Sequence, residues 1–378
     1  METIRFLHTG DWQLGMTRHF FSEGVQETYS QARFDAIRRL GEIAEQHKCQ
    51  FILVCGDVFE SNQVDRRTVA RTCEALKDVP VPVYILPGNH DPLNAAAVYQ
   101  SSTFSNQCPS HVHIIDDLLP RAVADGVELI GAPWRSKKPV VNPLEELIST
   151  LSPTEGSYRI VIGHGIVDTF TPDKDAPAII AAGNLEKVVS DRKADYIALG
   201  DRHSVTMLGT SGRVWYSGTP ESTDFREDKS GHALIVELDG NEISTQEVRI
   251  GRWTFVEKKQ VELNHADDVS DLVQFLTGFD NKERTVLGLR LCGGLTLALH
   301  AELQKSVQTA KDLFAGLDVR FDDLAMIPED ADFSKLGFSG FANKTVATLR
   351  DQIETGGDSA MEARDALLLL FRLAEGAA

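Results

Sequence analysis

Cysteine is scarce in this chain and is not arranged in a recognisable site. Its five cysteines are an odd number, and no two form a C-x-x-C pair; they are Cys49, Cys55, Cys73, Cys108 and Cys292. This usage argues against a disulfide framework and against a thiolate zinc site. Because unpaired cysteines are typical of a reducing compartment, we predict a cytoplasmic protein.

Long apolar runs are also missing. No stretch reaches the roughly 18 consecutive apolar residues that identify a membrane-spanning helix, so we expect no membrane association of that kind. The opening segment METIRFLHTGD lacks a basic region followed by an apolar core. It therefore does not read as a signal peptide.

Basic residues are fewer than acidic ones, 38 against 56, so the formal net charge is -18 at pH 7. Such a chain does not bind nucleic acid through its overall field, because an acidic surface repels phosphate. A local basic patch, phosphate binding through metal ions, or a basic partner subunit all stay open. A carboxylate-rich pocket for cations agrees with the same charge.

What is present is the composition of a globular protein long enough for more than one domain. The 378 residues are 42% hydrophobic and 25% charged, which is ordinary for a globular chain. We expect a first domain over residues 1–250, a small domain over 251–325 and a C-terminal helical segment over 326–378.

Strands and helices alternate along the first domain, as in an α/β fold. Apolar residues that recur with a period near 3.6 predict helices over residues 30–47 and 66–76. Short apolar runs predict strands over residues 4–8, 51–55, 81–86, 127–130, 159–162, 196–199 and 233–238.

The second part of the chain predicts a small β-α-β-α-β arrangement. Its strands are expected at 254–263, 285–291 and 318–321, and its helices at 268–276 and 297–313. Residues 322–340 look irregular, and two helices, 341–354 and 360–374, follow them.

Many of the first domain's strands end at glycine next to aspartate, asparagine or histidine. In α/β folds the carboxyl ends of strands converge on one edge of the sheet, where ligands bind. One such residue alone is usually a structural polar group, but an ordered series of them indicates a site. All but the glutamine are good metal ligands or acid/base groups, and in chain order the series is Asp11, Gln13, Asp57, Asn89, His90, His164, Asp201 and His203.

The order of these residues resembles that of the calcineurin-like metallophosphoesterases. Within that family, the segments LHTGDWQLG, VCGDVFE, LPGNHD, VIGHG, IALGDRH and YSGTPE are similar to nuclease subunits of SbcCD-type DNA repair complexes, including the YhaO-like branch. The resemblance covers about residues 1–240. It implies an α/β fold in which a β-sandwich is flanked by helices and followed by a small α+β cap and C-terminal helices.

The resemblance also implies a centre with two divalent metal ions. Carried over by position, one metal would be held by Asp11, Gln13, Asp57 and His203, and the other by Asp57, Asn89, His164 and Asp201. A bridging water would be the nucleophile. His90 would stabilise the transition state or protonate the leaving oxygen. Asp91 would either orient His90 or cap the turn that follows the strand, and both roles stay open.

Two positions depart from the family's pattern. Gln13 stands where the D-x-H motif has histidine, and Asp201 stands at the first histidine of G-H-x-H. Asp201 still offers an anionic oxygen, whereas Gln13 offers only a neutral amide oxygen. Replacing nitrogen by oxygen favours manganese, with magnesium as the second candidate, over zinc or iron. We expect an active enzyme whose first metal is held more weakly than its second.

The implied partners are DNA, an SbcC-like coiled-coil ATPase and a second copy of the chain, joined through the helices at 30–47 and 66–76. The apolar segment 363–373 either binds the ATPase or packs within its own chain. The basic run 135–138 either meets a phosphate backbone or is a solvated loop. We predict a metal-dependent DNA exonuclease subunit; the alternatives are a non-catalytic adaptor and a small-nucleotide phosphodiesterase.

Overall fold

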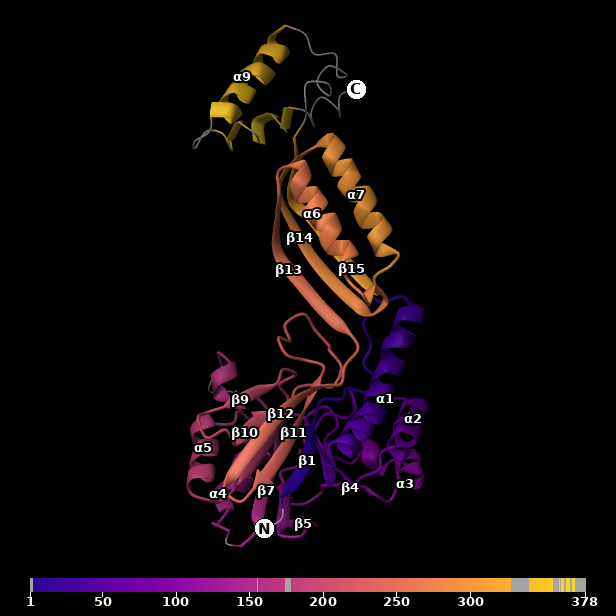
Figure 1. The fold of residues 1–378 in the computed structure, drawn as a ribbon, viewed down its shortest axis with the longest axis vertical. Coiled ribbons are helices and arrows are strands. Elements are labelled where there is room, and N and C mark those ends of the chain that lie inside the picture. Colours follow the sequence, from indigo (N-terminus) through magenta and orange to yellow (C-terminus); the bar gives the residue numbers. More distant parts are fainter. Residues whose placement is uncertain are drawn as a thin grey trace. The chain divides into compact units, whose positions relative to one another are not determined.

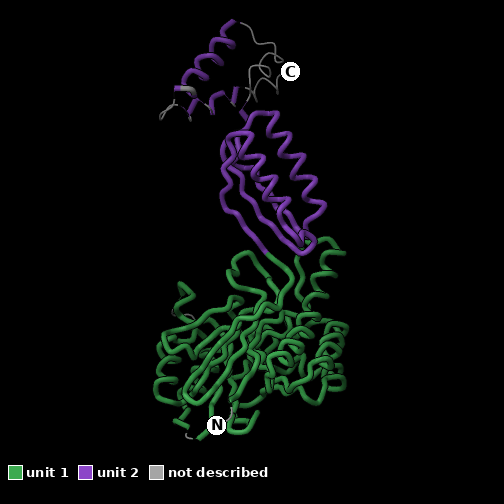
Figure 2. The backbone as a smooth tube through the Cα atoms, in the orientation of Figure 1, with its two compact units in different colours: residues 1–254 green, residues 255–378 purple. Residues whose placement is uncertain are grey.

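The chain folds into two compact units, residues 1–254 and residues 255–378 (Figure 2). The structure is a computed structural model that describes residues 3–154, 156–173, 178–327, 340–355, 360, 362–363, 365–367 and 369–370. The C-terminal helices belong to the second unit together with the small β-α-β-α-β arrangement.

The first unit is built on two six-stranded sheets, with strand orders β12-β11-β1-β2-β3-β4 and β5-β6-β7-β8-β10-β9 (Figure 1). Neighbouring strands run parallel from β1 to β4 in the first sheet and from β6 to β8 in the second. These strands are β1 (Ile4–Thr9), β2 (Phe51–Cys55), β3 (Val83–Leu86), β4 (Val112–Ile114), β6 (Val127–Gly131), β7 (Tyr158–His164) and β8 (Tyr196–Gly200). The others are β5 (Arg121–Ala124), β9 (Thr206–Leu208), β10 (Val214–Tyr216), β11 (His232–Asp239) and β12 (Glu242–Arg249).

Alternation along the central strands makes the two sheets into a sandwich. Successive side chains of a strand point to opposite faces. Thus Phe6 lies in the core between the sheets, while the next residue, Leu7, lies in the core beneath the helices. In β2, Leu53 likewise lies in the core between the sheets and Val54 in the core beneath the helices. Strands that are covered on both faces consist of continuous apolar residues. For this reason the sequence alone predicts them.

Helices cover the outer face of each sheet. The first sheet is covered by α1 (Glu23–Gln46), α2 (Arg66–Lys77) and α3 (Ser102–Gln107), and the second by α4 (Pro143–Thr150) and α5 (Ala182–Ser190). Helix α1 begins seven residues before the predicted start at residue 30, because its polar first turns carry little apolar signal. The expected α/β fold, a β-sandwich flanked by helices, is therefore confirmed.

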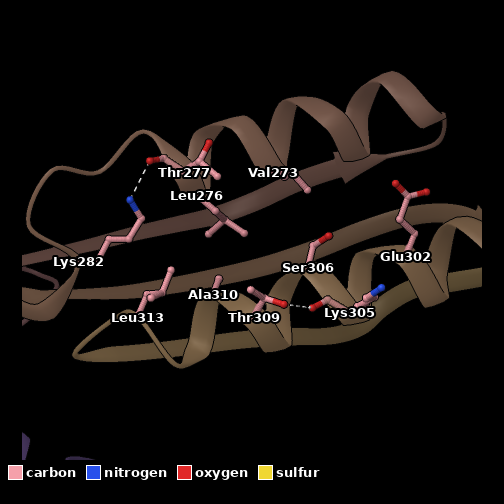
Figure 3. Close-up of a pocket in the computed structure, with 10 residues that line it drawn as sticks. All are labelled: Val273, Leu276, Thr277, Lys282, Glu302, Lys305, Ser306, Thr309, Ala310 and Leu313. Carbon is pink, nitrogen blue, oxygen red and sulfur yellow. Dashed lines mark hydrogen bonds between the residues drawn. The ribbon is translucent and has the colours of Figure 1, made fainter.

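The second unit has a three-stranded sheet of order β13-β14-β15. Two helices pack on it through a core that includes Leu272, Leu289 and Leu303. A hollow of about 380 Å³ lies between these helices, lined by Leu276 and Leu313 among others (Figure 3). In chain order the elements are β13 (Thr254–Leu263), α6 (Ala266–Thr277), β14 (Thr285–Thr296), α7 (Leu297–Lys311) and β15 (Gly316–Ile327).

The last strand of this sheet is longer than the sequence predicted. Residues 322–327, expected to be irregular, continue β15, because the strand pairs in parallel with β14 as far as the pair Thr296 and Ile327. The predicted irregular residues 328–339 lie outside the described residues. Across the ranges that are described, no helix combines the length and the apolar character needed to cross a membrane.

The C-terminal segment contains α9 (Phe341–Thr355) and helical residues after position 360. Val346 and Leu367 are buried together, and Leu297 packs against them. The described part of the apolar segment 363–373 therefore packs partly within its own unit, although Leu369 is 58% exposed. Residues 361, 364, 368 and 371–374 of the predicted final helix, and residues 375–378 after it, lie outside the described residues.

Candidate metal centre

The residues singled out in the sequence come together where strands of both sheets end. Asp11, Asp57 and Asn89 follow β1, β2 and β3 of the first sheet, while His164 ends β7 and Asp201 follows β8 of the second. Asp11, Asp57 and His164 are buried, and their potential ligand atoms all lie within 4.8 Å of one another. The edge that the strand ends predicted is therefore a cluster of acidic and imidazole groups.

The backbone of this edge is held in an unusual conformation. The φ angles of Asp11, Gln13, Asp57 and Asp201 are 52°, 51°, 52° and 96°. Residues other than glycine rarely adopt this left-handed region, and such strained residues gather at functional sites. Backbone bonds keep the loops in place, since Asp11 N donates to Gly56 O at 2.9 Å and Gln13 N donates to Asp57 O at 3.0 Å.

Two glycines allow the strand ends to approach one another. A Cβ atom at Gly56 would lie 2.2 Å from Nδ1 of His164, and Gly56 has a φ of +91°. A Cβ atom at Gly88 would lie 2.2 Å from Oδ1 of Asp57. Any larger residue would push the side chains of the cluster apart, so the glycines next to the strand ends are a packing requirement.

His164 presents one ring nitrogen to three oxygen atoms. Its Nδ1 lies 2.8 Å from the carbonyl oxygen of Cys55, which accepts the proton that this nitrogen carries. Its Nε2 lies 3.3 Å from Oδ1 of Asn89. The same Nε2 lies 3.5 Å from Oδ2 of Asp57 and 3.5 Å from Oδ1 of Asp201. These four residues are the set that the family resemblance assigned to one metal.

Gln13 carries an unsatisfied oxygen into the cluster. Its side chain is buried, and Nε2 donates to Oδ2 of Asp57 at 3.3 Å. Its Oε1 is buried and has no hydrogen-bond partner among the described residues. A buried acceptor without a hydrogen-bond partner lowers the stability of the folded chain. A cation bound to this oxygen would remove that cost. The donor set around Gln13 thus fits a metal ion.

His203 belongs to the other proposed ligand set, with Asp11, Gln13 and Asp57, and its ring is oriented by residues on the side away from the cluster. Its Nε2 lies 3.9 Å from Oδ1 of Asp11. Its Nδ1 lies 2.7 Å from Oε1 of Glu227 and 2.9 Å from Oγ1 of Thr223. Burial alone would lower the pKa of His203, but the hydrogen bond with Glu227 and the charge of Asp11 raise it to about 9. A carboxylate behind an imidazole is typical of metal sites, where it fixes the ring's orientation.

The charges of the cluster are out of balance without a cation. Burial raises the pKa of Asp11 to about 7 and also raises the pKa of Asp201. Burial alone would lower the pKa of His164, but the nearby Asp57 and Asp201 carboxylates raise it well above its usual value. These shifts favour protons on Asp11, Asp201 and His164, and those protons would offset part of the cluster's negative charge. Burial alone would raise the pKa of Asp57, but His164 holds it below its usual value. Divalent cations would perform the same neutralisation and free those protons.

His90 lies beside the cluster and is held at two atoms. Its backbone N–H donates to Oδ1 of Asp57 at 2.9 Å. Its Nδ1 lies 2.9 Å from the carbonyl oxygen of Glu60. With Nδ1 engaged there, Nε2 is the ring nitrogen left for a substrate.

Asp91 is held within the turn. Its carboxylate accepts from Gly88 N at 2.8 Å, from Phe59 N at 3.1 Å and from the hydroxyl of Tyr99 at 2.6 Å. These bonds favour the turn-capping alternative, and it is Glu60 that contacts the His90 ring.

Two hollows open beside the cluster and share Ile166 and Asp201. One, of about 440 Å³, is also lined by Asn89, Trp134 and the lysines of the basic run. The other, of about 580 Å³, is also lined by Arg202, His203 and Glu227. Among the candidate ligands, Asn89, Asp201 and His203 therefore line a hollow.

Three residues that build this site carry no local signal in the sequence. Glu227 reaches His203 from 24 positions further along the chain. Trp134 and Asn142 both bond to the backbone of His164. Their roles depend on where distant segments return to the site, so only a pattern of residues that vary together among relatives would have indicated them.

Comparison with known proteins agrees with this geometry. The family model described as calcineurin-like phosphoesterase matches residues 4–236, a range that contains every residue of the cluster. The SbcD subunit of the nuclease SbcCD from Escherichia coli is 26% identical over 275 residues, which cover 65% of this chain and 67% of that protein.

Two further relatives match along more of the chain. The DNA double-strand break repair protein Mre11 of Archaeoglobus fulgidus is 22% identical over 381 aligned positions, covering 93% of this chain and 82% of that protein. The uncharacterized metallophosphoesterase YhaO of Bacillus subtilis is 21% identical over 294 residues, which cover 74% of this chain and 68% of that protein. The family match spans most of the chain and the whole candidate centre, and the chain therefore belongs to the calcineurin-like phosphoesterase family.

Proposed function

We propose that this chain is a metal-dependent DNA nuclease, the exonuclease subunit of a DNA repair complex. The observation that carries the proposal is the group of oxygens from Asn89, Asp57 and Asp201 around one nitrogen of His164. Calcineurin-like phosphoesterases use a dimetal centre. Relatives named as a nuclease subunit and as a double-strand break repair protein support DNA as the substrate.

The proposed ligands divide into two sets that share one carboxylate. One metal would be held by Asp11, Gln13, Asp57 and His203, and the other by Asp57, Asn89, His164 and Asp201. A pair of divalent cations acidifies water and stabilises charge on phosphoryl oxygens. Because most of these donors are oxygens, manganese is the proposed metal, with magnesium as the second candidate.

His90 is the proposed catalytic acid. Its contacts at the backbone N–H and at Nδ1 fix the ring. Nε2 can then donate a proton or a hydrogen bond to the leaving oxygen of the phosphodiester. Asp91 supports this step indirectly, by holding the turn that carries His90.

The two hollows favour a chain-like substrate over a small nucleotide. Both are lined by Ile166 and Asp201, and each is otherwise lined by residues of its own. A phosphodiester that continues in both directions can occupy both hollows, whereas a small nucleotide fills one. The net charge of -18 makes DNA affinity depend on bound cations and on a partner.

The proposed partners are an SbcC-like ATPase, contacted by residues 341–378, and a second copy of the chain, contacted through α1 and α2. Exposed Phe341 and Leu369 give the C-terminal segment apolar surface for such a contact. Co-purification of the ATPase with the native chain, and its loss when residues 341–378 are deleted, would test the first contact.

The activity is tested by cleavage of labelled single- and double-stranded DNA with manganese, magnesium or a chelator. Manganese-dependent cleavage is expected in the native chain and is expected to be lost in Asp57→Ala and His90→Ala. The exposed-lysine variant Lys48→Gln serves as a control. If the folded native chain cleaves no DNA with any metal, alone or with the ATPase, the nuclease proposal fails and the adaptor is favoured.

A further inference from the structure

A loop that follows β6 is attached at both ends to a residue of the candidate metal centre. Nε1 of Trp134 donates to the carbonyl oxygen of His164 at 2.8 Å. Nδ2 of Asn142 donates to the same oxygen at 3.2 Å. Asn142 also begins α4, because its Oδ1 accepts from Leu144 N at 2.8 Å. Residues 135–141 thus form a short wall whose two ends are fixed beside the proposed ligands.

This wall presents positive charge that nothing else in the described chain uses. Lys137 and Lys138 are exposed, and neither has an ion-pair partner within the part of the chain that the structure describes. Arg135 differs from them, because its guanidinium donates to the carbonyl oxygen of Asp116 at 2.6 Å. In a chain with a net charge of -18, two unpaired lysines beside a cluster of carboxylates are the residues available for a phosphate.

The hollow behind the wall suits a nucleotide. Its volume of about 440 Å³ lies within the ~300–1,000 Å³ range of pockets for small molecules. It is lined by Asn89 and Asp201 from the metal centre, by both lysines, and by the apolar side chains of Trp134 and Val140. Phosphate groups bind lysine, and the faces of bases pack on apolar and aromatic side chains.

We infer that this hollow binds one unpaired nucleotide next to the phosphodiester that is cut, and that Lys137 and Lys138 bind the following phosphate. The inference rests on the proposed function and specifies its substrate. A base in a duplex is stacked and paired, so it must leave the helix to enter such a hollow, whereas a single strand enters without that cost. Single strands and frayed ends are then the preferred substrates over an intact blunt duplex.

The test removes the two charges and leaves the metal centre untouched. In Lys137→Gln/Lys138→Gln we expect the KM for a single-stranded oligonucleotide to rise about tenfold at low salt. The slope of log KM against log salt concentration should fall by roughly 0.7, the value for one phosphate contact on a single strand. Turnover of bis(p-nitrophenyl) phosphate, a small phosphodiester with no neighbouring phosphate, should be unchanged. The Lys137→Arg/Lys138→Arg variant keeps the charges and should keep the native KM.

Two further variants separate the wall from the general surface. Lys187→Gln/Lys259→Gln removes two exposed lysines, one in α5 and one in β13, that line neither hollow, and should leave the KM unchanged. Val140→Asp places a carboxylate at a side chain that is 86% exposed, so the fold is kept. This variant should raise the KM for the single strand at least as much as the lysine pair does.

The outcomes distinguish this inference from the proposed function. If the lysine variant leaves the KM unchanged while the native chain cleaves both substrates, the inference is wrong and the nuclease stands. An equal rise in KM in the control pair would also overturn the inference. So would a native chain that prefers a blunt duplex over a single strand. If the native chain hydrolyses neither substrate with any metal, both proposals fail.

Discussion

Oε1 of Glu227 lies 2.7 Å from Nδ1 of His203, and the opposite ring nitrogen of His203 faces Asp11. The Glu227 side chain is only 7% exposed. Burial alone would raise its pKa, but the hydrogen bond and the charge of His203 hold the pKa of Glu227 below its usual value. Glu227 therefore stays ionised and fixes which nitrogen of His203 is available to a metal.

Removing Glu227 should weaken the binding of the metal that His203 is proposed to hold. We expect Glu227→Ala to raise the manganese concentration needed for half-maximal hydrolysis about 10- to 100-fold. Glu227→Gln, which keeps an acceptor oxygen, should have a smaller effect. Glu247→Gln is a matched control, because Glu247 belongs to a surface ion pair with Lys229 at 3.0 Å. A native metal dependence in Glu227→Ala would mean that His203 needs no support.

The orphaned amide oxygen of Gln13 leads to a prediction about metal affinity. Since that oxygen is neutral, the native chain should bind two manganese ions with unequal affinities in isothermal titration calorimetry. Gln13→His should strengthen the weaker site and shift its preference toward zinc, because imidazole is a softer ligand. Two equally tight manganese sites in the native chain would contradict the prediction.

The raised pKa of Asp11 predicts how stability without metal depends on pH. Because burial raises this pKa from 3.8 to about 7, ionised Asp11 destabilises the folded protein above pH 7. In a chelator at pH 8, Asp11→Asn should therefore be at least as stable to heat as the native chain. The difference should shrink as pH falls from 7 toward 3.8, since in that range folded Asp11 holds a proton that the unfolded chain lacks. A variant that is less stable at pH 8 would contradict this.

Adding manganese should make the native chain more stable than Asp11→Asn. At a concentration of 100 times Kd, a ligand that binds only the folded state stabilises it by about 2.7 kcal/mol. The native chain should gain this stability, and Asp11→Asn should gain much less. Differential scanning calorimetry with manganese and with chelator measures both values for each protein.

Gly56 offers a test of the close approach between the two sheets. A methyl group there would overlap the His164 ring and would occupy a positive φ. We expect Gly56→Ala to lower the free energy of unfolding by about 2–4 kcal/mol and to abolish hydrolysis. Gly24→Ala is the control, because no atom lies within 4 Å of its added Cβ in α1. The control should be neutral or stabilising by up to about 1 kcal/mol. Equal effects of the two substitutions would contradict the role of Gly56.

The buried strands could be predicted from the sequence, and several short or exposed elements could not. The runs at β2 and β8 are apolar because helices and the opposite sheet cover both of their faces. Strand β12 alternates between exposed and partly buried residues, so its sequence resembles a polar loop. The short helices α4 and α5 gave too few apolar repeats to be recognised.

For the candidate centre, the sequence alone predicted the groups that could bind metal, because each of them lies at or after the end of a strand that its own residues specify. It also determined that oxygen donors outnumber nitrogen donors. Only the tertiary structure decided which nitrogen of each histidine faces the cluster, since Cys55 O and Glu227 select it. It also decided that the basic run borders the centre, because Trp134 and Asn142 tie that loop to His164. Such contacts join residues far apart in the chain, and no local pattern of residues encodes them.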